Sequence, residues 1–143
     1  MVAGVASVAE LRERVVGWFR REPKIVVPRS ILIVEGNSKN RQSTARLVES
    51  LGYVPHQTAG VVGALRHLDE EDPDFVLLGF DLADGDALDA IAKVRELAPE
   101  LPIVMLAADT WDTRVAEAMR RGAVAYLARP FGRDDLRELL GRR

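Results

Sequence analysis

Five short runs of mainly apolar residues, alternating along the chain with segments of helical periodicity, limit the fold most tightly. The runs occupy positions 31–34, 53–56, 75–78, 102–106 and 124–128, and the second contains Pro55, which favours a sheet edge. Segments with helical spacing follow at 40–51, 61–70, 87–98, 111–121 and 134–140. Strands that alternate with helices require right-handed crossovers, which make the sheet parallel and cover both of its faces. The sequence therefore predicts an α/β fold with a doubly wound five-stranded parallel sheet of order 2-1-3-4-5.

Residues 1–28 precede this pattern and are predicted to form an extra amphipathic helix and a linker, leaving 29–143 as the globular domain. Ser7 and Glu10 fit a capping box at the helix start, and Pro23 stops the helix. One helical face is apolar and consists of Val8, Leu11, Val15, Trp18 and Phe19. This stripe either docks on its own domain or forms an interface with a second copy or a partner protein.

Composition excludes several classes of function. The formal net charge of −2 on 143 residues provides no field that would hold the whole chain on nucleic acid or an anionic membrane. The chain has no cysteine, so disulfides and cysteine metal sites are absent. No apolar run approaches the ~20 residues that span a bilayer. We therefore expect a cytoplasmic protein that binds neither nucleic acid nor membranes directly.

Six ordered motifs resemble those of response-regulator receiver domains, the CheY-like group with the flavodoxin-like fold. The resemblance covers about residues 29–143. The motifs are an aliphatic run and an acid at 31–35, Gly-Tyr-Val at 52–54, Pro-Asp-Phe-Val-Leu-Leu at 73–78, Pro-Ile-Val-Met-Leu at 102–106, Gly-Ala at 122–123 with Tyr-Leu at 126–127, and Arg-Pro-Phe at 129–131.

The resemblance also identifies the positions that carry phosphoryl chemistry in receivers, and here those positions have changed. The third strand of a receiver ends in an aspartate that accepts the phosphoryl group, and this chain has Gly79 there. The first loop of a receiver supplies two acids that hold Mg²⁺, and the matching residues are Glu35 and Gly36. Because glycine has no carboxylate, we expect neither phosphorylation nor a metal or other cofactor.

Two further positions of the receiver site differ, whereas two positions of its switch region match. Ala107 stands where receivers use a threonine or serine hydroxyl, and Arg129 stands where they use lysine. Tyr126 matches the aromatic residue that changes rotamer on activation, and Pro130 matches the proline that follows the lysine. The resemblance therefore implies a degenerate pseudo-receiver that is not an enzyme.

Glu35 and Arg129 follow the first and fifth strands and should project into the same crevice at the carboxyl edge of the sheet. We predict that they form an ion pair there. The alternative is that both side chains extend into water, where an exposed pair contributes only ~0–1 kcal/mol.

Two functions remain open. The first is a phosphorylation-independent signalling module that acts through a protein partner or a homodimer, with Trp111, Tyr126, Pro130 and the segments 111–121 and 134–140 on its docking face. The second is a small-ligand sensor that uses the crevice around Glu35, Gly79 and Arg129, where two glycines would leave room.

The remaining polar residues suggest ordinary structural roles. Asp81, Asp84, Asp86 and Asp109 are interpreted as loop and helix-cap acids, because their spacing does not fit a calcium loop. The histidines, His56 and His67, are far apart in the sequence and are interpreted as surface or boundary residues.

Overall fold

The structure is a computed structural model that describes residues 29–141, so that residues 1–28 and 142–143 lie outside its description. Its strands are β1 (Ser30–Val34), β2 (Val54–Thr58), β3 (Phe75–Gly79), β4 (Ile103–Ala107) and β5 (Ala125–Ala128). They form one parallel sheet in the order β2-β1-β3-β4-β5. The predicted order 2-1-3-4-5 is confirmed.

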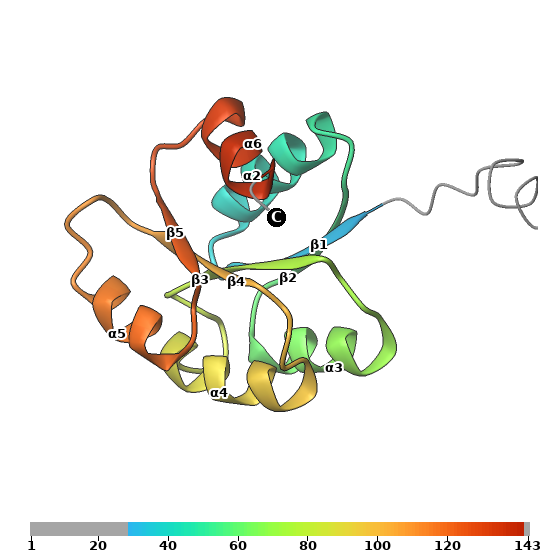
Figure 1. Ribbon diagram of the computed structural model, residues 1–143, viewed down its shortest axis with the longest axis vertical. Helices are drawn as coiled ribbons and strands as arrows, with labels where there is room; N and C mark the ends of the chain where they lie inside the picture. The colour runs from blue at the N-terminus through green and yellow to red at the C-terminus, as the bar shows by residue number, and fades with distance from the viewer. Residues whose placement is uncertain (1–28, 142–143) are drawn as a thin grey trace, which may run out of the picture.

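Helices cover both faces of this sheet. They are α2 (Ser38–Ser50), α3 (Val61–Glu70), α4 (Ala87–Leu97), α5 (Arg114–Arg121) and α6 (Arg133–Gly141). Figure 1 shows α2 and α6 on one face of the sheet and α3, α4 and α5 on the other. The predicted α/β architecture is therefore confirmed.

The central strands are buried because helices lie on both of their sides. Every residue of β3 and β4 is buried, and successive side chains point to opposite faces. Leu32 and Met105 belong to the core beneath α3, α4 and α5, whereas Ile31 and Leu77 belong to the core beneath α2 and α6. Burial on both faces explains why these strands are continuous apolar runs in the sequence.

Pro55 predicted an edge position for the second strand, and this prediction is confirmed. β2 is at one edge of the sheet, beside β1, and its residues are exposed or half-buried. Pro55 pairs in register with Ile31. An edge position tolerates the missing amide because one side of the strand has no neighbour to bond.

The helix after β4 begins later than predicted. We expected it from Trp111, but α5 starts at Arg114. The Asp112 carboxylate accepts hydrogen bonds from the backbone N–H groups of Ala108 and Arg114, each at 3.1 Å. A short polar side chain that bonds nearby amides favours a loop over a helix, so residues 108–113 form a loop.

The predicted helix with Val8, Leu11, Val15, Trp18 and Phe19 lies outside the described residues, as does the proposed linker. Among the helices of residues 29–141, none is long and apolar enough to cross a bilayer.

We predict that Leu136→Ala lowers the free energy of unfolding by about 2–5 kcal/mol, because it leaves a cavity in a close-packed core. Leu136 is fully buried on α6. Urea unfolding followed by circular dichroism measures the change. Val62→Ala is the control, since Val62 is 58% exposed on α3, and should change stability by less than about 0.5 kcal/mol. Similar losses in both variants would contradict the description of the core.

Candidate functional site

The predicted crevice residues meet at the carboxyl edge of the sheet. Gly79 ends β3 and Ala107 ends β4, while Glu35 follows β1 and Arg129 follows β5. The backbone N–H of Arg129 donates to the carbonyl of Ala107 at 3.0 Å. Gly36, in the loop after β1, donates its N–H to the carbonyl of Asp81 at 3.1 Å. Parallel strands thus bring residues from across the sequence into one site.

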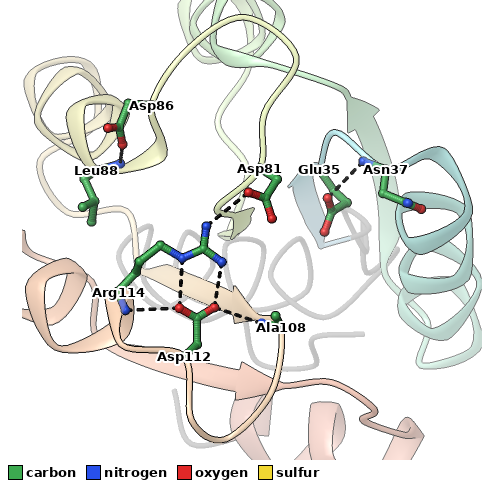
Figure 2. Close-up of polar contacts among 8 residues, drawn as sticks. All are labelled: Glu35, Asn37, Asp81, Asp86, Leu88, Ala108, Asp112 and Arg114. Atoms are coloured by element: carbon green, nitrogen blue, oxygen red, sulfur yellow. Dashed lines mark hydrogen bonds and ion pairs between the residues drawn. The ribbon is translucent and has the colours of Figure 1, made fainter.

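A buried ion pair lies at the centre of this edge. The Glu35 side chain is 7% exposed, and its Oε1 accepts a hydrogen bond from Nη2 of Arg129 at 3.1 Å. Its other oxygen, Oε2, accepts from the backbone N–H of Asn37 at 3.1 Å, which Figure 2 shows. Arg129 also lies over the Phe131 ring, 5.2 Å from its centroid. The predicted Glu35–Arg129 pair is therefore confirmed.

The Glu35 carboxylate also fills the space beside Gly79. A Cβ atom built on Gly79 would lie 2.9 Å from Glu35 Oε1 and 3.1 Å from its carboxyl carbon. Any side chain at position 79 would displace this carboxylate. The expectation that the two glycines leave room for a ligand is therefore wrong for Gly79.

Gly36 is enclosed as tightly, but by backbone. A Cβ atom at position 36 would overlap the carbonyl oxygen of Asp81 and lie 3.3 Å from the Cα of Leu82. A second acid cannot occupy this position unless the loop moves. Since Glu35 is paired with Arg129 as well, the residues present do not fit a Mg²⁺ site. Within residues 29–141, no group of three or more acids and histidines is arranged to hold a metal.

A second cluster, centred on Arg114, lies on the neighbouring loops. Its guanidinium donates to both oxygens of Asp112, at 2.9 and 3.0 Å, and to Oδ1 of Asp81 at 3.1 Å (Figure 2). The same group stacks on the Phe80 ring, 4.5 Å from its centroid. Sequence analysis did not single out Arg114 or Asp112.

Asp112 is the buried member of the cluster, with a side chain only 4% exposed. The hydrogen bonds from Arg114 hold the pKa of Asp112 at about 2, below its ordinary value of 3.8, against the opposing effect of burial. The paired carboxylates in turn raise the pKa of Arg114. At neutral pH Asp112 and Arg114 are therefore both charged.

Together these contacts join three loops of the crevice. Arg114 joins the loop after β4 to Asp81 in the loop after β3. The carbonyl of Asp81 accepts the N–H of Gly36, in the loop after β1. Side-chain and backbone groups of the protein make each of these contacts.

The other loop acids cap helices or turns, as interpreted from the sequence. Asp84 accepts from the N–H groups of Val61 and Val62 at the start of α3, and these bonds lower the pKa of its carboxyl group. Asp86 caps α4 by accepting from Leu88 at 2.8 Å (Figure 2). Asp109 accepts from the N–H of Trp111 at 2.8 Å. Asp81 differs from these acids because its carboxylate pairs with Arg114.

The two histidines lie closer together than their sequence separation indicated. The rings of His56, on β2, and His67, on α3, are 4.7 Å apart between centroids. Burial lowers the pKa of His67, and the neighbouring His56 lowers it further. Both are partly buried boundary residues, which agrees with the interpretation from the sequence.

The comparison that decides the family is the match of residues 31–141 to the model of the response regulator receiver domain. The chain belongs to this family. Its receiver fold explains why the crevice residues come from the ends of different strands.

The curated relatives are regulators of greater length than this chain. The DNA-binding transcriptional regulator NtrC of Bradyrhizobium sp. is 24% identical over 113 residues, which are 79% of this chain and 24% of that protein. The phosphate regulon transcriptional regulatory protein PhoB of Klebsiella pneumoniae is 28% identical over 110 residues, which are 76% of this chain and 48% of that protein. The chain thus spans about a quarter to a half of the length of these relatives.

Among solved structures, the receiver domain of sensor histidine kinase PA1611 from Pseudomonas aeruginosa is similar, with a TM-score of 0.74 and 29% identity. The match covers 81% of this chain and 97% of that domain. That structure has a magnesium ion coordinated in its active-site cleft. In the present receiver, the corresponding edge of the sheet carries the Glu35–Arg129 pair.

The predicted docking face of this receiver is exposed. Trp111 is 85% exposed in the loop before α5, and Tyr126 is 46% exposed on β5, so its ring points outward. Met119 on α5 and Val124 beside β5 are exposed as well. Pro130, which follows β5, forms a cis peptide bond with Arg129 and lies at the border of the crevice.

We predict that Asp112→Asn reduces the loss of stability in acid. Because the pKa of Asp112 is lower in the folded protein than its ordinary 3.8, the ionised carboxylate stabilises the fold above that pH. This contribution disappears as the pH falls toward about 2, the folded pKa.

Urea unfolding at about pH 5 and about pH 2.5 measures the effect, and the variant should lose less stability between the two than the wild type. Asp69→Asn, on the exposed surface of α3, should retain the wild-type loss. Equal losses for Asp112→Asn and the wild type would contradict a stabilising role for the Asp112 carboxylate.

Proposed function

We propose that this chain is a pseudo-receiver: a non-enzymatic signalling module that works without phosphorylation and acts through protein contact. The observation that supports the proposal most directly is the state of the acceptor position. Gly79 ends the third strand, and the Glu35 carboxylate fills the space beside it. A Cβ atom built on Gly79 would lie 2.9 Å from Oε1 of Glu35. A receiver with this arrangement has no carboxylate at the position that attacks phosphorus.

The loop contacts support the same proposal. In receivers, a threonine or serine hydroxyl after the fourth strand bonds the phosphoryl group, and here Ala107 stands at that position. Arg114 instead joins the loops after the third and fourth strands through Asp81 and Asp112. The module would therefore present one constant conformation to its partner, and its signal would depend on its abundance or on partner binding.

The exposed aromatic residues favour a protein partner. Aromatic side chains are enriched in protein interfaces, and Trp111 and Tyr126 are exposed on the face where receivers commonly dock. The partner is a signalling protein or a second copy of the chain. Neither nucleic acid nor a membrane is expected to bind directly, and we place the module in the cytoplasm.

The alternative of a small-ligand sensor has less support. It required free volume around Gly36 and Gly79, and this volume is taken by Asp81 backbone and by the Glu35 carboxylate. Arg129 is already paired with Glu35, so it would have to break that contact to bind an anionic ligand.

We predict that the chain stays unmodified when it is incubated with acetyl phosphate and Mg²⁺. Intact-mass spectrometry provides the measurement, and a receiver that has the acceptor aspartate is the positive control. The reason is the missing carboxylate at Gly79 together with the pairing of Glu35 by Arg129. A phosphoryl group on Glu35 or Asp81 would refute phosphorylation independence.

We also predict that Trp111→Ala and Tyr126→Ala weaken partner binding by about tenfold or more, while leaving stability within about 0.5 kcal/mol of the wild type. Quantitative affinity purification from the native host compares each variant with the wild type. Val62→Ala, on the distant surface of α3, is the matched control and should retain every partner. Retention of all partners by both aromatic variants would locate the docking face elsewhere.

A further inference from the structure

A groove lies at the amino edge of the sheet, at the opposite end of the strands from the crevice. It has a volume of about 390 Å³ and lies between the connections that lead into β3 and β4. Leu68 and Leu101 form its buried floor, and Leu97, at the end of α4, is 48% exposed beside it. Three prolines also line it: Pro73, Pro99 and Pro102. This groove is largely apolar at its centre.

The rim of the groove is acidic. The exposed acids Asp72 and Glu100 line it, and Glu70 and Glu71, which precede Asp72 along the chain, line an adjoining groove. No ion pair within residues 29–141 involves these four side chains. A concentration of negative charge on a chain whose net charge is only −2 attracts basic groups.

The described chain begins beside this rim. Arg29 lines an adjoining groove of about 570 Å³, which shares Asp72 and Asp74 with the first. Its guanidinium lies 5.3 Å from the centroid of the Tyr53 ring and 4.0 Å from Oδ1 of Asp74. Residues 1–28 therefore connect to the domain at the acidic edge, on the side away from Gly79.

The chemistry of residues 1–28 complements this surface. The predicted apolar stripe ends in Trp18 and Phe19. The stretch between it and the domain carries three basic residues, Arg20, Arg21 and Lys24, and one acid, Glu22. The ten residues that follow Phe19, up to Arg29, span up to ~33–36 Å when extended. That reach is longer than a five-residue strand, which is ~17 Å, so the stripe can return to the groove.

We propose that residues 1–28 dock in cis on this groove, with Trp18 and Phe19 against Leu97 and the basic residues along the acidic rim. The segment then covers the amino edge of the sheet. Trp111 and Tyr126 stay open to a partner, because they lie in a different region of the surface. The proposal does not depend on phosphorylation independence.

Disulfide trapping tests the position directly, because the chain has no cysteine of its own. In full-length Gly17→Cys/Ala98→Cys, which keeps Trp18, Phe19 and Leu97, mild oxidation should give an intramolecular disulfide, seen as a faster monomer band on a non-reducing gel. Ala98 lines the groove, and Gly17→Cys/Val62→Cys is the control, since Val62 is exposed on α3 away from the lining residues. Linked dimers would assign the groove to a second copy, and trapping no faster than the control would also overturn the proposal.

Fluorescence provides a second readout that needs no new bond. In a Trp111→Phe background Trp18 is the only tryptophan, and docking should give it a blue-shifted emission at every protein concentration. Glu71→Lys/Asp72→Lys should shift the emission to the red, whereas Glu49→Lys, on α2, should not. A fully exposed Trp18 in the parent protein, or emission unaffected by the rim charges, would overturn the proposal.

Discussion

The geometry of the crevice depends on the Glu35 carboxylate, which is almost completely buried. Burial of an unpaired carboxylate is costly, so the Glu35 side chain requires compensation on both of its oxygens. Arg129 supplies it to one oxygen and the Asn37 amide to the other. The Nη2 group of Arg129 also lies 3.5 Å from the hydroxyl of buried Thr44. One ion pair thus links the loop after β1 to the segment after β5.

The Arg114 cluster extends this organisation across the rest of the edge. It contributes a bidentate ion pair, a bond to a second acid and a stacked ring, which a lysine could not provide together. Asp112 also accepts hydrogen bonds from the N–H groups of Ala108 and Arg114, so a side chain of the loop before α5 holds that loop's own backbone in place. Ion pairs and hydrogen bonds between loops therefore hold this edge of the sheet together.

Much of the fold was predictable, because it depends on local pattern and topology. Continuous apolar runs and Pro55 correctly indicated central and edge strands, and the strand ends correctly placed Glu35 beside Arg129. Packing around the glycines was not predictable, since the sequence does not show which neighbour takes the space of an absent side chain. Arg114 was missed because its partner Asp81 is 33 residues away. The sequence signal that could have indicated this cluster is Asp112, two residues before Arg114. Aspartate side chains in turns often accept a hydrogen bond from the backbone N–H two residues further on.

The enclosure of Gly36 and Gly79 makes these two positions depend on their neighbours. An aspartate at position 79 would displace the Glu35 carboxylate, and an acid at position 36 would collide with the Asp81 backbone. Neither acid could therefore be introduced alone without disturbing the packing. An engineer who wished to build a carboxylate-lined metal site into this edge of the sheet would have to change several residues together.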